Sequence, residues 1–391
     1  MTKRRIGGLI LLMLVIAVWV ALPKHDRSSV TEVSGPVAET QAHEEMAQSA
    51  SAPIKPVAAS DLWTRPDAKV ASRNGRRHGF AWILRQLGAT EDQLNRLAAL
   101  DIAGVLAELQ QKAQAGDAAS INILGEIALQ NCYLGRDDAT VESYVASQIR
   151  DVQAVPAIDA SWFTEVLRDE EDFYKKVHAA CAQVDVDGAM SLVKAQAEKG
   201  DGASLWLVFR DANNMTEMQQ RLREAAAAGF PQAQFELAWA IIGGQEGAAG
   251  TGVGNVRAGD MLKESIEQLP RSETQLAVCE YSGCDGVAVD VNAAIKHARE
   301  AAQRGSPDAI LSIGPHVPAG QLDPNEVTAW SLVQASLQQR GCGGNGFSVR
   351  EMKGVTSTLN ANNISAKARA LAEQYWQEFG TQMMSNIGCT P

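Results

Sequence analysis

Apolar and small residues recur at intervals of three and four through most of this chain, and a glycine closes each run. The clearest run opens at Asp290, continues through Ala294 and the pair Ala301 and Ala302, and reaches Gly305. This spacing places the small residues on one face of a helix. Aspartate can cap the first N–H groups, and glycine can adopt the left-handed conformation that ends a helix. We therefore predict a helix between Asp290 and Gly305 and a second helix directly after it.

The same frame recurs, although Glu326 opens one copy and Leu269 replaces the turn glycine in another. One such helix pair cannot bury its own apolar face, so neighbouring pairs must stack. We therefore predict an all-α fold, an α/α superhelical solenoid of helix-turn-helix repeats over residues 101–345, with one diverged unit within 133–180. The residues that define the repeats are Asp101, Gly116, Asp185, Gly200, Asn214, Gly229, Asp290, Gly305 and Gly341.

The best-preserved copy resembles a Sel-one-like repeat, a relative of the tetratricopeptide repeat. The matching residues are Gly286, Val287, Asp290, Ala294, Ala301, Ala302, Gly305, Ala309, Ile313 and Gly314. The resemblance implies α/α solenoids that act as adaptors in membrane-associated complexes and share no catalytic residues. His297 stands where the family often has an aromatic residue, and the copies are uneven, so we expect an irregular superhelix.

Helical caps are expected on both sides of the repeats. Residues 66–100 include Thr90 and Gln93, the spacing of a capping box. Residues 346–391 include an amphipathic helix whose aromatic side chains face the preceding repeat. A terminal repeat would otherwise expose apolar surface. The whole is expected to form one curved rod of helix pairs. The apolar residues expected to face the last repeat are Leu371, Tyr375, Trp376 and Phe379.

The N-terminal segment predicts a membrane anchor. Residues 1–5 include Lys3, Arg4 and Arg5, and residues 6–23 are uncharged, mostly apolar and just long enough to span a bilayer. A signal peptidase cut after Ala21 would put Trp19 where a small residue is needed, so an uncleaved anchor is favoured over a signal peptide. Basic residues stay in the cytoplasm, which places the rest of the chain in the periplasm of a bacterium. Residues 24–65 are small, polar and rich in proline, which predicts a flexible linker.

Six cysteines follow the apolar segment, which predicts disulfides in an oxidising compartment. Six cysteines allow fifteen pairings, so the sequence leaves the connectivity open. Two of them are five residues apart and could staple a turn, two flank the diverged unit, and two bracket the last segment. No CxxC spacing occurs, and neither His297 nor His316 lies at ligand spacing from a cysteine, so no metal site is expected. The cysteines that are five residues apart are Cys279 and Cys284, those that flank the diverged unit are Cys132 and Cys181, and those that bracket the last segment are Cys342 and Cys389.

Charge and motifs narrow the function. The chain has 35 Lys and Arg against 46 Asp and Glu, a net charge of −11, which disfavours nucleic acid as a partner. The glycines at 250–254 match only part of a nucleotide-binding fingerprint and follow a helix rather than a strand, so no cofactor is expected. No nucleophile elbow or zinc-protease motif occurs. We interpret the basic cluster at 73–78 and the acidic run at 169–172 as solvated helix faces.

These features favour a binding protein rather than an enzyme. The leading hypothesis is an inner-membrane-anchored periplasmic adaptor with a protein partner. The first alternative is an immunity protein that neutralises a periplasm-targeted effector such as a lipase. The second is a hydrolase of cell-wall material or antibiotic rings, for which no nucleophile and base can be assembled. Large aromatics dominate interface energetics, and the candidate partner-binding residues are Trp206, Trp239 and Trp330.

Overall fold

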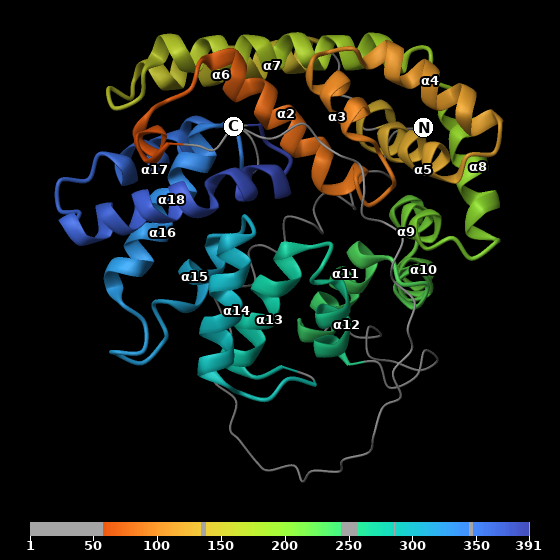
Figure 1. Ribbon diagram of the computed structural model, residues 1–391. Coiled ribbons are helices and arrows are strands. Elements are labelled where there is room, and N and C mark those ends of the chain that lie inside the picture. Colours follow the sequence, from red (N-terminus) through yellow and green to blue (C-terminus); the bar gives the residue numbers. More distant parts are fainter. Residues whose placement is uncertain (1–57, 134–137, 244–256, 285, 344–346, 391) are drawn as a thin grey trace. The chain divides into compact units, whose positions relative to one another are not determined.

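The computed structural model describes residues 58–133, 138–243, 257–284, 286–343 and 347–390 (Figure 1). These residues are helices and connecting turns, with isolated β-bridges as their only extended pairing. The predicted anchor at 6–23 and most of the predicted linker lie outside the described residues. Within the described ranges, no helix combines the length and apolarity needed to cross a membrane.

The helices follow one another with short connections. In chain order they are η2 (Ala59–Trp63), α2 (Ala68–Leu84), α3 (Glu91–Ala98), α4 (Ile102–Gln114), α5 (Ala118–Ile127), the π-helical η3 (Ala128–Tyr133), α6 (Asp138–Gln153), α7 (Ala160–Cys181), α8 (Val186–Ala197), α9 (Gly202–Asp211), α10 (Met215–Ala227), α11 (Pro231–Ile242), α12 (Ala258–Ser265), α13 (Pro270–Ser282), α14 (Val291–Gln303), α15 (Asp308–Ile313), α16 (Pro324–Gln339), α17 (Val349–Leu359) and α18 (Ala366–Asn386).

Successive helices pack as antiparallel pairs of the predicted kind. The pairs are α4 with α5, α8 with α9, α10 with α11, α12 with α13, and α14 with α15. Their capping side chains accept hydrogen bonds from the first-turn N–H groups, as when Asp290 Oδ1 accepts from Asn292 and Ala293. The predicted turn glycines have φ between 79° and 112°, which side chains resist. Those caps are Asp101, Asp185, Asn214 and Asp290, and those glycines are Gly116, Gly200, Gly229, Gly305 and Gly341.

Two copies depart from the predicted frame. Asp323, rather than Glu326, caps α16, because Pro324 takes the first helical position. Leu269 adopts an extended conformation before Pro270 opens α13, so the chain turns there without a glycine. By the spacing of the other copies, that copy would open at Gly254, which lies outside the described residues. Proline thus supplies a second way to start a helix in this array.

The two ends of the described chain contact each other, which the sequence did not predict. Helix α2 packs on α7 and also meets the last residues of the chain. Residues 59–65 are not linker: η2 is helical, Leu62 is fully buried, and its carbonyl accepts a hydrogen bond from Ser336 Oγ. The N-terminal segment therefore belongs to the core.

The C-terminal helix packs as the sequence predicts. Tyr375 stacks on Trp330 of α16 with ring centroids 4.5 Å apart, and Phe379 lies 6.5 Å from the same ring. Trp376 is fully buried, and Leu371 is half-buried against the same core. The amphipathic face of α18 thus covers α16.

Candidate functional site

All six cysteines are paired. The bonds join Cys132 to Cys181, Cys279 to Cys284, and Cys342 to Cys389. The first links the end of η3 to the end of α7, and the third links the residues after α16 to the C-terminal tail. The prediction that the six cysteines form disulfides is therefore confirmed, and the structure supplies the connectivity that the sequence left open.

The basic cluster and the acidic run are only partly solvated, because Arg76 of the first pairs with Asp169 and Glu170 of the second. Arg76 on α2 is buried, and its guanidinium lies 2.5 Å from Asp169 and 3.7 Å from Glu170 of α7. The same guanidinium donates to Ser72 Oγ at 2.7 Å and to the Ala98 carbonyl at 3.1 Å. A buried charge is costly without a partner, so these ion pairs hold α2 against α7.

Burial also changes the titration of this junction. Removal from solvent raises the pKa of Glu170 to about 7, against the lowering effects of Ser72 and Arg76. Ser72 Oγ donates a hydrogen bond to Glu170 Oε1 at 2.8 Å. The carboxyl group therefore titrates near neutral pH.

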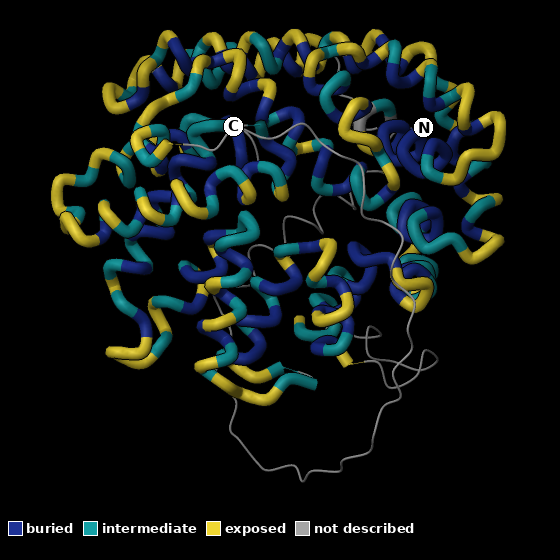
Figure 2. Tube along the Cα trace, in the orientation of Figure 1, coloured by how far each residue is buried: buried dark blue, intermediate teal, exposed yellow. Residues whose placement is uncertain are grey.

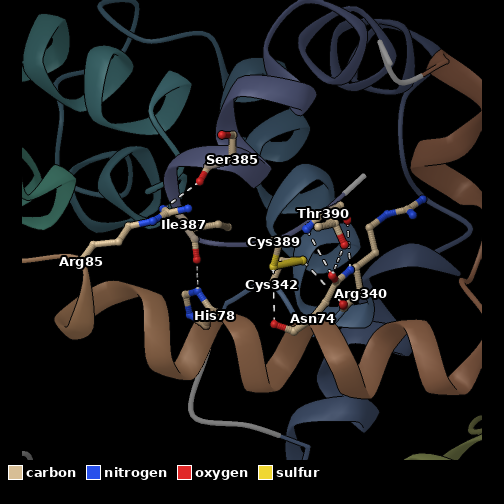
Figure 3. Close-up of a disulfide and its surroundings, with 9 residues drawn as sticks. All are labelled: Asn74, His78, Arg85, Arg340, Cys342, Ser385, Ile387, Cys389 and Thr390. Carbon is tan, nitrogen blue, oxygen red and sulfur yellow. Dashed lines mark hydrogen bonds between the residues drawn. A yellow bond between two sulfur atoms is a disulfide. The ribbon is translucent and has the colours of Figure 1, made fainter. Parts of the chain in front are cut away.

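The C-terminal tail closes over the other side of α2 (Figure 3). The Asn74 side chain donates to the Thr390 carbonyl at 3.1 Å, and its Oδ1 accepts from the Thr390 amide at 3.1 Å and hydroxyl at 2.7 Å. His78 Nδ1 lies 2.6 Å from the Ile387 carbonyl, and burial lowers the pKa of His78. Only glycine fits at 388, where a Cβ would clash with Ala81. We call these contacts, together with the Arg76 pairs, the α2 junction.

Two of the three predicted partner-binding tryptophans are core residues. Trp206 is 2% exposed and Trp330 is 1% exposed, so neither can contact a partner in this conformation. Trp206 Nε1 instead donates to Glu236 at 3.2 Å. Trp239 on α11 is half-buried, so part of it is accessible to solvent, and it donates to Gln275 on α13 at 3.3 Å. Figure 2 shows how buried, intermediate and exposed positions alternate along the helices. Helical spacing alone gives no way to separate these two populations.

Trp239 belongs to a group of side chains that converge from α11, α13, α15 and α2. Aromatic rings in this group are half-buried, while its charged members are exposed. The mixture of apolar surface with exposed charge is typical of a surface that binds a protein. We call this group the inner face, and it comprises Trp82, Phe235, Trp239, Arg271, Gln275 and Asp308.

Arg271 is the centre of the inner face. Its guanidinium carbon lies 4.9 Å from the centroid of the Trp82 ring and 5.8 Å from that of Phe235. Such cation–π contacts orient a guanidinium while leaving its N–H edge available. No hydrogen bond or ion pair joins that group to another of the described residues. The sequence did not single out Arg271, because one arginine early in a helix carries no motif.

Acidic residues surround Arg271 without contacting it. Partial loss of hydration to the surrounding protein raises the pKa of Asp308 and of Glu236 and lowers the pKa of Arg271. Glu236 already accepts hydrogen bonds from Gln232 and Trp206. The inner face therefore has one cation and one exposed acid, Asp308, that are not paired with each other.

The remaining polar groups form local pairs. His297 Nδ1 lies 2.6 Å from Glu280, and His178 Nδ1 lies 3.0 Å from Asp138. Among the residues that the structure describes, no three His, Cys, Asp or Glu side chains gather as metal ligands would. The glycines at 250–254 lie outside these ranges. A groove of about 530 Å³ lies between α16 and α17, lined by side chains such as Gln334 and Arg350.

Comparisons with known proteins give structural neighbours and no close relatives. No family model and no curated protein matches the chain. It is similar to a Sel1 repeat protein from Oxalobacter formigenes at 18% identity, over 68% of this chain and 89% of that one, with a TM-score of 0.32. It is also similar to a protective antigen of uropathogenic Escherichia coli with an SLR fold at 14% identity, over 72% and 73% of the two chains, with a TM-score of 0.27. These neighbours are Sel1 repeat proteins, the family that the repeat motifs resemble.

Proposed function

We propose that this chain is a protein-binding module whose inner face holds another protein. The observation that carries the proposal is the convergence of half-buried aromatics with exposed Arg271 and Asp308 on neighbouring helices. Many other large aromatic side chains of the described residues, such as Trp206 and Trp330, are buried in the core. The resemblance of the repeats to an adaptor family supports the same function.

The proposal includes a place in the cell. Residues 6–23 would anchor the chain in the bacterial inner membrane, with the basic residues 1–5 in the cytoplasm and the helical array in the periplasm. The three disulfides support an oxidising compartment. A topology reporter fused after Pro391 should be active in its periplasmic form and silent in its cytoplasmic form. The reverse pattern would contradict the anchoring.

Affinity capture tests the binding function. The full chain would be tagged at its C-terminus and purified from detergent-solubilised membranes of the cells that produce it. We expect a stoichiometric partner with the unmodified chain and its loss with Asp308→Lys, which reverses an exposed charge of the inner face. Arg150→Glu is the matched control, because Arg150 is exposed on α6. A partner that is retained by Asp308→Lys, or absent from every preparation, would contradict the proposal.

The identity of the partner would then separate two roles. A resident membrane or periplasmic protein would identify an adaptor. An effector that is toxic when directed to the periplasm, and is neutralised by co-expression of this chain, would identify an immunity protein.

A further inference from the structure

The arginines of this molecule fall into two kinds. Arg299 is a satisfied one: its Nε and one terminal nitrogen donate to the two carboxylate oxygens of Glu326 at 2.7 and 2.8 Å. Arg271 has the same fork of N–H donors but no carboxylate within ion-pair distance among the described residues. A guanidinium matches a carboxylate in a planar, bidentate arrangement. Arg271 therefore presents an incomplete pair.

The residues around Arg271 hold its guanidinium in place before a negatively charged group binds. The Trp82 and Phe235 rings hold its position from α2 and α11. Holding a side chain in place before binding reduces the entropy lost on binding. The surrounding protein removes part of its hydration, which lowers the pKa of the guanidinium and makes a matching anion more favourable.

The charge of the neighbourhood selects the kind of anion. Asp308 and Glu236 are close enough to act on Arg271 electrostatically. Glu236 repels an incoming anion, and a phosphate with nearly twice the charge is repelled more than a carboxylate, while exposed Asp308 is free to pair with a cationic group of the bound protein. A carboxylate also fits the single fork that Arg271 offers.

Solvent reaches the site. Arg271 and Asp308 are both exposed. Gly79, one turn before Trp82 on α2, is exposed as well, and a Cβ placed there would meet nothing within 4 Å. A peptide segment can therefore approach the rings from the side that α2 leaves open.

We propose that Arg271, flanked by Trp82 and Phe235, is a carboxylate-binding subsite that receives an acidic side chain or the C-terminal carboxylate of the bound protein. This inference rests on the proposed function, since it names the group that the inner face recognises. Arg271 acts by direct hydrogen bonds, and the rings act by positioning it.

Side-chain NMR tests the subsite without knowledge of the partner. The probe is the Nε–Hε resonance of Arg271 in the ¹⁵N-labelled full-length chain in detergent, assigned by its absence in Arg271→Lys. Blocked tripeptides are titrated in separate arms: acetyl-Ala-Glu-Ala-amide for a side-chain carboxylate, acetyl-Ala-Ala-Ala acid for a terminal one, and acetyl-Ala-Gln-Ala-amide as the neutral match. Acetyl-Ala-phosphoSer-Ala-amide tests phosphate.

We expect a saturable shift of the Arg271 resonance with a carboxylate peptide, a dissociation constant in the millimolar range, and no shift with the neutral peptide. The carboxylate arm that binds more tightly identifies the source of the group. Trp82→Leu should weaken binding several-fold, and the resonance of Arg150 should not move. Equal shifts with the neutral peptide, no shift up to the solubility limit, or tighter binding of phosphoserine would overturn the subsite.

The two proposals fail differently. If carboxylates leave Arg271 unmoved while Asp308→Lys still abolishes capture, the subsite is wrong and the binding face stands. If carboxylates bind but capture is insensitive to Asp308→Lys, the subsite is real and the inner face is not where the partner sits.

Discussion

Arg76 belongs to α2 and Arg271 lies over the Trp82 ring of the same helix, and the surroundings of the two guanidinium groups differ in one respect. In the α2 junction, Arg76 is paired with Asp169 and donates to Ser72 and Ala98. In the inner face, Arg271 rests on two rings and has no hydrogen-bond partner among the described residues. A guanidinium whose donors are satisfied within the fold stabilises that fold, whereas one that is held in place with its donors unused is available to a ligand.

The comparison predicts its largest effect on stability at Arg76. Arg76→Ala leaves Asp169 and Glu170 without their buried cation, and breaking such a pair costs about 3–5 kcal/mol in the free energy of unfolding. Chemical denaturation monitored by circular dichroism would measure the loss. Arg65→Ala is the matched control, because Arg65 pairs with Asp159 in a far more exposed place. Equal losses for the two variants would contradict a structural role for the α2 junction.

The loss of stability should differ between the disulfides, because only Cys342–Cys389 joins the C-terminal tail to the rest of the chain beside the α2 junction. Replacing Cys342 and Cys389 by serine releases a loop of 47 residues, which should cost about 4 kcal/mol in the chain-entropy account. The Cys279–Cys284 bond closes only 5 residues, and its loss should cost about 2 kcal/mol. Denaturation curves of the two double variants give the difference. A larger loss for the short loop would show that the tail is not fastening the array.

Glu170 gives the α2 junction a pH dependence. Its folded-state pKa of about 7 lies above the unfolded value of 4.5, so the folded chain binds the proton more tightly. Glu170 therefore contributes to the free energy of unfolding below pH 4.5, and this contribution is lost as the pH rises through 7. The loss is on the order of 1–3 kcal/mol. The Glu170→Gln variant has no carboxyl group to ionise at this position, so its free energy of unfolding should not fall in this way. The difference in the free energy of unfolding between this variant and the unmodified chain should therefore grow from pH 5 to pH 8. A difference that stays constant across this range would contradict the raised pKa.

Arg271 should matter little for folding. Arg271→Ala removes two cation–π contacts at an exposed site, which costs about 0.5–1 kcal/mol. The same variant should lose partner capture. A loss of stability comparable to that of Arg76→Ala would mean that Arg271 is a structural residue, and the contrast between the two regions would disappear.

Alanine substitutions at two glycines should change the stability least, and in opposite directions. At exposed Gly79 in α2, alanine meets nothing and improves helix propensity, so Gly79→Ala should stabilise by about 0.5–1 kcal/mol. At Gly388 in the α2 junction, φ is +81° and a Cβ would clash with Ala81, so Gly388→Ala should destabilise. Thermal melts of both variants would show the signs. Destabilisation by Gly79→Ala would mean that the space beside α2 is not open.

Local patterns in the sequence predicted most local features of this fold. Asp290 and Gly305 mark one helix because capping and the left-handed turn depend on nearby atoms alone. The even count of cysteines predicted disulfides, while their connectivity came from the structure. The contact between Arg76 and Asp169 was not predictable, because it joins residues 93 positions apart through packing that no local pattern records. The burial of Trp206 and Trp330 and the exposure of Arg271 depend on the same long-range packing.

Photo-crosslinking in living cells shows whether a partner binds at the inner face. A benzophenone amino acid would replace Gly79 on α2, one turn from Trp82 of the inner face, and, in a separate strain, Arg150 on α6, both of which are exposed. We expect a crosslinked protein of defined mass from position 79 and none from position 150, and loss of that product when Arg271→Ala is added. Crosslinking from position 150 alone, or a product at 79 that Arg271→Ala leaves unchanged, would contradict a binding function of the inner face.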